Sequence, residues 1–85
     1  MGEREKEIIE IARRVNVGIA GNKVTSYKQK LISAISLKDY DRVQVVLIQL
    51  SSYSNVKMDF LVDLFSDFQK NKNLAYTFIN ALGTN

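Results

Sequence analysis

The 85-residue sequence contains no cysteine and no histidine. Without cysteine, disulfides, thiolate metal sites and thiol nucleophiles are all excluded. Without histidine, the common zinc sites and every catalytic triad that depends on imidazole are excluded as well. A catalyst built from this chain would have to rely on carboxylates, lysine and tyrosine alone. We therefore expect a protein that is not an enzyme and that uses no metal and no cofactor.

Proline is also absent, and no apolar run approaches the roughly 20 residues that span a bilayer. The lack of proline agrees with helices joined by short polar turns. The N-terminus is charged where a secretory signal would need an apolar core. We therefore expect a cytoplasmic protein with no membrane partner.

Hydrophobic residues make up 46% of the chain and charged residues 25%, which is typical of a globular domain and not of a disordered segment. The length allows one domain, residues 1–85, with a small core that stabilises the fold by only about 3–5 kcal/mol. Assembly with a partner is a natural source of further stability for such a chain.

Apolar residues recur every three or four positions over most of the chain, the spacing of amphipathic helices. This pattern predicts an all-α fold, an irregular bundle of four to five helices, over residues 3–20, 26–35, 39–50, 58–69 and 74–82. Residues 21–25 and 51–55 are predicted to interrupt the helices, and Asp39 is predicted to cap the third. The β-branched run 43–48 could also form a strand, but no second convincing strand is present to pair with it.

Charge is distributed unevenly along the chain, although the formal net charge is only +3. From Ile11 to Lys38 every charged residue is basic, so this segment carries +6, whereas the rest combines six bases with nine acids and carries −3. A segregated basic surface is the electrostatic footprint of phosphate binding. We predict that nucleic acid binds through the six basic residues of this segment, Arg13, Arg14, Lys23, Lys28, Lys30 and Lys38.

Polar side chains lie among these bases and could donate hydrogen bonds to phosphate oxygens. Residues 22–26 are the best single anion-site candidate, because the start of the second helix would offer free backbone amides beside Lys23. Tyr27 is the one aromatic residue of the basic segment, and its spacing with Leu31 favours core packing over base stacking. We therefore expect backbone contacts with weak sequence dependence and steep salt dependence. A solvated basic face without a ligand is the alternative interpretation.

The residues Asp59, Asp63 and Asp67 recur at four-residue steps and line one stripe of the fourth helix. Carboxylates on a single helix complete neither a metal cage nor an acid–base pair across a cleft. We therefore expect a solvated or partner-facing stripe. It could also meet the basic face of a neighbouring copy, which would stack copies head to tail.

Three segments carry a resemblance to a known family: residues 22–35 (NKVTSYKQKLISAI), the helix that follows over residues 39–50, and the ending 73–83 (NLAYTFINALG). Together they resemble the helical domain that closes the large subunit of type I CRISPR Cascade complexes, especially the I-B type. In such systems this domain can also be made as a separate small subunit.

The resemblance implies a non-catalytic small subunit that lies beside the guide RNA and the target DNA. Its other implied partners are the remaining Cascade subunits and neighbouring copies of itself. Such a subunit supports the heteroduplex and the displaced strand through contacts with the nucleic-acid backbone, while base pairing supplies sequence specificity.

Two other classes of protein stay open. A helix-turn-helix DNA-binding protein would use the second and third helices, but Asp39 and Asp41 would lie at the end of its recognition helix that faces the groove. A helical protein–protein adaptor would bind no nucleic acid at low salt, and it would tolerate charge reversal at Lys23, Lys28 and Lys30.

Overall fold

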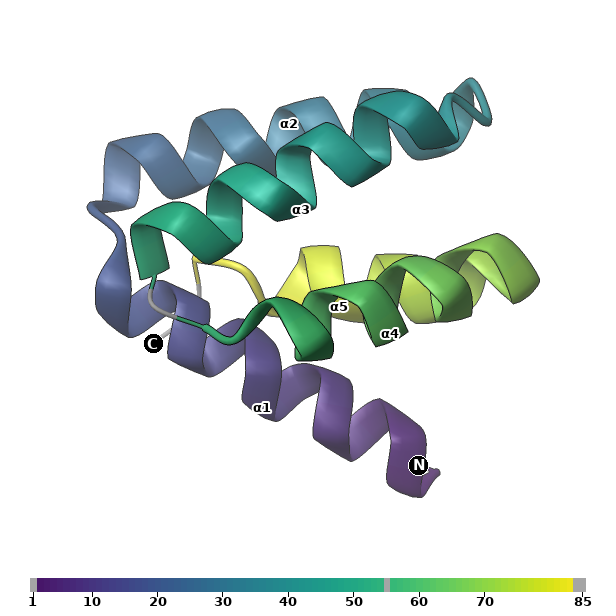
Figure 1. Ribbon diagram of the computed structural model, residues 1–85, viewed down its shortest axis with the longest axis horizontal. Helices are drawn as coiled ribbons and strands as arrows, with labels where there is room; N and C mark the ends of the chain where they lie inside the picture. Colours follow the sequence, from purple (N-terminus) through teal and green to yellow (C-terminus); the bar gives the residue numbers. More distant parts are fainter. Residues whose placement is uncertain (1, 55, 84–85) are drawn as a thin grey trace.

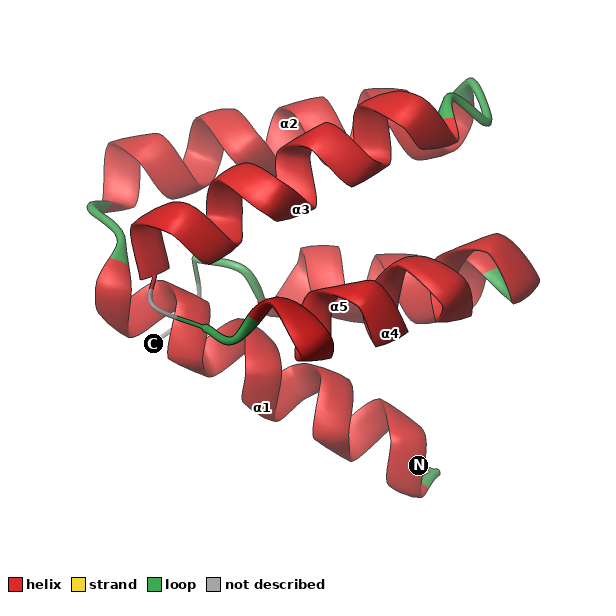
Figure 2. Ribbon diagram, in the orientation of Figure 1, coloured by secondary structure: helices red, strands yellow, loops and turns green. Residues whose placement is uncertain are grey.

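The computed structural model describes residues 2–54 and 56–83, and the regular structure in this part is entirely helical (Figure 1, Figure 2). The helices are α1 (Glu3–Gly18), α2 (Gly21–Ser36), α3 (Tyr40–Ser54), α4 (Met58–Lys70) and α5 (Lys72–Ala81). The predicted all-α bundle is confirmed, and residues 43–48 lie within α3, so the strand alternative is wrong. None of these helices combines the length and the apolar character needed to cross a membrane.

Helix α2 begins at Gly21, so the loop predicted over residues 21–25 is wrong. Ala20 is extended and occupies the N-cap position, and its carbonyl accepts hydrogen bonds from the backbone N–H groups of Lys23 (3.0 Å) and Val24 (3.1 Å). The Val24 side chain is almost fully buried in the core. Burial of this side chain outweighs the low helix propensity of valine, which is why the helix starts early.

Helix α3 continues to Ser54, so the interruption predicted over residues 51–55 is wrong for residues 51–54, and Asn55 lies outside the described residues. The Ser54 hydroxyl donates to the carbonyl of Leu50 within the helix, and the Ser51 hydroxyl donates to the carbonyl of Val56 at 2.8 Å. Serine side chains that bond to carbonyls in this way are compatible with a continuing helix. The second bond also fixes the chain as it leaves α3.

Helices α4 and α5 are separated by Asn71 alone, where the sequence pattern predicted a break over residues 71–73. The Asn71 side chain accepts a hydrogen bond from the backbone N–H of Asn73 at 3.0 Å and so caps the N-terminus of α5. Gly83 follows the end of α5 with a left-handed φ of 81°, a conformation that glycine adopts without strain after the end of a helix.

A tight turn of Leu37, Lys38 and Asp39 joins α2 to α3. Lys38 has a left-handed φ of 57°, and the Asp39 N–H donates to the carbonyl of Ala34 at 2.8 Å, which closes the end of α2. The Asp39 carboxylate accepts from the backbone N–H of Arg42 at 3.2 Å. The predicted capping role of Asp39 is therefore confirmed.

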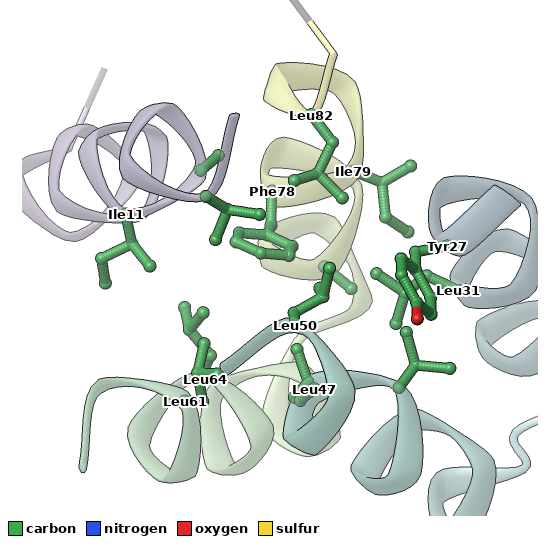
Figure 3. Packing of buried hydrophobic residues seen from close by; sticks show 14 of the residues in the cluster. Ile11, Tyr27, Leu31, Leu47, Leu50, Leu61, Leu64, Phe78, Ile79 and Leu82 are labelled. Carbon is green, nitrogen blue, oxygen red and sulfur yellow. The ribbon is translucent and has the colours of Figure 1, made fainter. Parts of the chain in front are cut away.

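Helices α2 and α3 lie side by side as one hairpin, and α4 and α5 form a second one (Figure 1). Helix α1 packs mainly against α5 and also against α3. Apolar side chains from all five helices fill the interior, where Phe78 lies near the centre (Figure 3) and its ring centroid is 5.7 Å from that of Phe68. Burial of this cluster, at about 25 cal/mol per Å² of apolar surface, holds the two hairpins and α1 together.

The end of α1 approaches α3 unusually closely at Gly18, the last residue of α1. A Cβ atom added to Gly18 would lie 2.7 Å from the Cα of Ser54 and 2.8 Å from its carbonyl oxygen. Only glycine fits such a contact without displacing backbone, so Gly18 allows the C-terminal ends of α1 and α3 to meet. Since only Ile19 and Ala20 separate α1 from α2, this contact sets the start of α2 beside the last turn of α3.

Candidate nucleic-acid interface

Lys23 and Lys30 lie seven residues apart on one flank of α2, where both contact aromatic rings. The Lys23 ammonium is 4.8 Å from the ring centroid of Tyr53 in α3, and the Lys30 ammonium is 5.4 Å from the ring centroid of Tyr27. The two ring centroids are 6.1 Å apart. We call these four side chains the lysine–tyrosine row. It places two cations and an accessible ring along the seam between α2 and α3.

The two rings of the row differ in exposure. Tyr27 is 9% exposed, so its predicted place in the core is confirmed, whereas Tyr53 is 51% exposed. Burial, together with the adjacent Tyr53, raises the pKa of the Tyr27 hydroxyl above its ordinary value. The sequence pattern missed Tyr53 because it ended the third helix at residue 50. A helix that continued would have placed Tyr53 opposite the start of α2.

The start of α2 adds backbone donors beside the row. Residues 22–26, predicted as an anion-binding loop, are helical, but the helix start still lies next to Lys23. The first N–H groups of a helix have no preceding turn to supply acceptors. The N–H of Lys23 is already bonded to the Ala20 carbonyl and to the Asn22 side chain, so the donors at this helix start are the N–H groups of Gly21 and Asn22. A helix N-terminus beside an ammonium group is an arrangement that attracts an anion.

Lys28 lies on the opposite flank of α2, where it serves the fold. Its partly buried ammonium donates to the carbonyl of Leu82 at 3.3 Å. From the other side, the Asn16 side chain donates to the carbonyl of Ala81 at 2.9 Å and accepts from the N–H of Gly83 at 2.8 Å. Both side chains satisfy backbone groups at the end of α5. The structure thus separates Lys28 from the lysine–tyrosine row.

The two arginines of the acid-free segment, Arg13 and Arg14, lie on α1 near acidic residues. Arg13 pairs with Glu10 at 2.9 Å. Arg14 lies with its guanidinium carbon 5.8 Å from the ring centroid of Phe60, in a cleft between α1 and α4 that Glu7 and Glu10 also line. Helical spacing therefore brings acids from before the acid-free segment onto the same surface as these two bases. Their positive potential is reduced accordingly.

Lys38 lies in the turn at the far end of α2, about 24 Å of helix from its start. It is exposed, and its ammonium forms no ion pair within residues 2–54 and 56–83. The structure thus brings Lys23 and Lys30 together and places the other four predicted residues on separate surfaces. The six bases do not form one continuous patch.

The acidic stripe of α4 divides into two parts. Asp67 is not available to a partner, because its carboxylate pairs with the Arg4 guanidinium (Nε to Oδ2, 2.7 Å) and links α4 to the first turn of α1. Asp59 and Asp63 are exposed, which agrees with a solvated or partner-facing role for these two. Within the described residues, no three carboxylates gather closely enough to hold a metal ion.

Comparison with known families identifies the group to which the chain belongs. A family model described as the CRISPR-associated protein Csx8 matches residues 1–82. The chain belongs to the Csx8 family. No curated protein and no solved structure matches it. The predicted association with CRISPR systems is therefore confirmed, whereas the narrower assignment to the small subunit of a type I-B complex stays a prediction.

The α2–α3 hairpin of this Csx8-family chain gives no support to the helix-turn-helix alternative. In that motif the two helices cross at about 90–120° so that the second can enter the major groove. Here α2 and α3 run side by side along their length (Figure 1), and Asp41 is exposed in the first turn of α3. An acid at this position would enter the negatively charged groove, which disfavours binding.

Proposed function

We propose that this Csx8-family chain is a non-catalytic small subunit of a cytoplasmic CRISPR ribonucleoprotein. In this role it contacts the sugar–phosphate backbone of the guide RNA and the target DNA without reading bases. It supports the guide–target heteroduplex and the displaced strand, next to other subunits and to neighbouring copies of itself. Membership of a CRISPR-associated family supports the setting, and the lysine–tyrosine row supports the mode of contact.

The observation that carries the proposal is that, among the described residues, neither Lys23 nor Lys30 forms an ion pair, although Asp39 and Asp41 line the same hollow as Lys30. Within residues 2–54 and 56–83, the ion pairs of Arg4, Lys6, Arg13 and Arg42 each neutralise a base, whereas neither lysine of the row has a carboxylate within salt-bridge distance. Their spacing sets the two Cα atoms about 10 Å apart along the axis of α2. Two unpaired ammonium groups aligned in this way match a string of phosphates better than a single anion.

Weak sequence dependence follows from the chemistry of the row. Ammonium groups recognise phosphate as point charges and do not form the bidentate contacts that distinguish bases. Tyr53 is the exposed aromatic ring of the row, and ring stacking accepts every base. The chain also lacks histidine and cysteine, which supports a binding role over a catalytic one.

The test reverses the charge of the row and compares it with a matched control. Lys23→Glu with Lys30→Glu changes the row, and Lys70→Glu with Lys72→Glu makes the same change in net charge at two exposed lysines near the α4–α5 junction. Lys28 stays unchanged because it supports the end of α5. Circular dichroism checks that both variants keep their helices.

Fluorescence anisotropy is measured with labelled single-stranded RNA and with an RNA–DNA heteroduplex over a range of salt concentrations. We expect the row variant to lose about tenfold or more in affinity and to show a shallower salt dependence, while the control loses about twofold. Equal losses in the two variants would refute the row as the contact surface.

A protein–protein adaptor is the competing function, and the same experiment separates it. An adaptor would bind neither the single-stranded RNA nor the heteroduplex at low salt. Purification of the native chain would then yield only protein partners. Our proposal expects guide RNA and larger subunits to co-purify with it.

A further inference from the structure

Tyr53 lies in the last turn of α3 and is the most exposed aromatic side chain among the described residues. Its neighbour Tyr27 belongs to the core cluster (Figure 3). The two ring planes meet at 32°, and a centroid separation of 6.1 Å is within the usual range for a packed aromatic pair. Tyr27 thus supports the Tyr53 ring from the core, while about half of the Tyr53 side chain stays open to solvent.

The ammonium group nearest to this ring is held only loosely. Lys23 contacts the Tyr53 ring and forms no ion pair within residues 2–54 and 56–83. Stacking of a base on an exposed ring is stronger than the contact of that ring with an exposed ammonium. A nucleotide would therefore displace Lys23 from the ring. Its base would take the ring, and its phosphate would take the ammonium.

The use of this ring requires an unpaired base. In a duplex the bases are stacked on one another, so a duplex would reach the row through its phosphates alone. A single strand can turn its bases outward and stack them on aromatic side chains. It also bends freely, whereas a DNA duplex is stiff over about 150 base pairs. A single strand can therefore place phosphates at both Lys23 and Lys30 while one of its bases stacks on Tyr53.

Acidic residues limit the row at its Lys30 end. Asp39 and Asp41 line a hollow together with Lys30 and Arg42. Arg42 pairs with Asp39 at 3.6 Å, whereas Asp41 is exposed and forms no ion pair within residues 2–54 and 56–83. Carboxylates at this end repel phosphates that continue along α2 toward the turn. A single strand can bend away from them after a few nucleotides, but a stiff duplex laid along α2 cannot.

We propose that the lysine–tyrosine row binds single-stranded nucleic acid in preference to a duplex, with an unpaired base stacked on Tyr53 and phosphates on Lys23 and Lys30. This inference rests on the proposed function and names the form of nucleic acid that the row takes. The lysines attract phosphates of either form, so Tyr53 is the residue that determines the preference. Every base has a ring face, and the preference therefore carries no base sequence. Both RNA and DNA supply such bases.

The probes are labelled strands of about 12 nucleotides, within the range of single-strand sites. They are single-stranded RNA, single-stranded DNA, the RNA–DNA duplex of the same sequence, and an abasic DNA strand that keeps its phosphates but lacks bases. Fluorescence anisotropy at low salt measures their binding to the full chain. We expect a single strand to bind about tenfold more tightly than the abasic strand, and about fivefold more tightly than the duplex although the duplex carries phosphates on both strands.

A tighter single strand of either kind supports the proposal, and its sugar identifies the source as RNA or DNA. If the duplex or the abasic strand binds as tightly as the intact single strands, the proposal is overturned. These comparisons use the unmodified chain, so they do not depend on the folding of a variant.

Two matched variants locate the stacking at Tyr53. Tyr53→Leu keeps an apolar cover on Tyr27 but offers no aromatic face, whereas Tyr53→Phe keeps the ring. We expect Tyr53→Leu to weaken intact single strands about tenfold while it leaves the duplex and the abasic strand within about twofold. Tyr53→Phe should stay within about twofold for every probe. An equal loss for all probes with Tyr53→Leu, or an equal loss in the two variants, would overturn the proposal.

Failure of this inference and failure of the proposed function give different results. If Lys23→Glu with Lys30→Glu removes binding but the unmodified chain binds single strands and duplex equally, only the single-strand preference is overturned. If the unmodified chain binds none of the probes, the proposed function fails as well. An acidic peptide is the competing class of ligand. Polyglutamate of matched charge that displaced the labelled strand as effectively as an unlabelled single strand would show recognition of charge alone and would overturn the proposal.

Discussion

Gly18→Ala tests whether the close contact between α1 and α3 limits stability. The added Cβ would lie 2.7 Å from the Cα and 2.8 Å from the carbonyl oxygen of Ser54. Non-bonded carbon atoms prefer about 3.5–4.0 Å, so one helix would have to move by roughly 1 Å. The contact atoms belong to the backbone and cannot rotate away. Overpacking of this kind costs about 1–3 kcal/mol.

Alanine also has a better helix propensity than glycine, which offsets this loss of stability by at most about 1 kcal/mol in a helix interior and by less at the last residue of a helix. The free energy of unfolding should therefore fall by about 1–2 kcal/mol, and Tm by roughly 5–15 °C for a chain of this size. Gly21→Ala is the matched control, because its Cβ would meet nothing within 4 Å. We expect it to be neutral or stabilising by up to about 1 kcal/mol.

Urea and thermal unfolding of both variants, followed by circular dichroism at the helix band, measure the difference. An unchanged m-value would assign the loss to the native state and not to the denatured ensemble. If Gly18→Ala is as stable as Gly21→Ala, the approach of α1 to Ser54 is not a constraint on the fold and the reasoning is refuted.

Two further contacts allow stability measurements. A double-mutant cycle of Arg4→Ala and Asp67→Ala should give a coupling of about 0.5–1 kcal/mol, because both side chains are partly exposed, and about 1 M salt should reduce it. A coupling of zero would mean that the pair does not link α1 to α4. Asn71→Ala should lower the free energy of unfolding by about 1 kcal/mol through loss of the α5 cap, whereas Asn71→Ser should retain most of it. Equal urea midpoints for the two variants would contradict the capping role.

The helices were predictable because apolar spacing reports a buried face directly. Their ends were less predictable, since tertiary contacts decided them. Because Val24 packs into the core, α2 begins earlier in the sequence than predicted. The hydroxyl of Ser51 donates a hydrogen bond to the carbonyl of Val56, beyond the end of α3. Neither effect has a local sequence signal, because valine and serine are both weak helix formers when considered alone.

The sequence predicted which segment carries the basic residues, but it did not predict which of them share one surface. The acid-free segment correctly includes Lys23 and Lys30, but a linear count cannot separate them from Lys28, which helical spacing turns to the opposite flank of α2. The partners of these lysines come from distant parts of the chain. Tyr53 and the carbonyl of Leu82 are brought to α2 only when the bundle closes.

The pairing of the first helix with the last has a consequence for synthesis on the ribosome. Asn16 bonds to Gly83, which is 67 residues later in the chain, and α1 packs mainly against α5. At about 5–20 residues per second, the apolar stripe of α1 waits roughly 3–12 s for its main neighbour to be translated. The α2–α3 hairpin needs only local contacts and can form during this interval. Nascent chains are therefore most exposed to aggregation and to proteases after α1 has emerged and before Phe78 has been added.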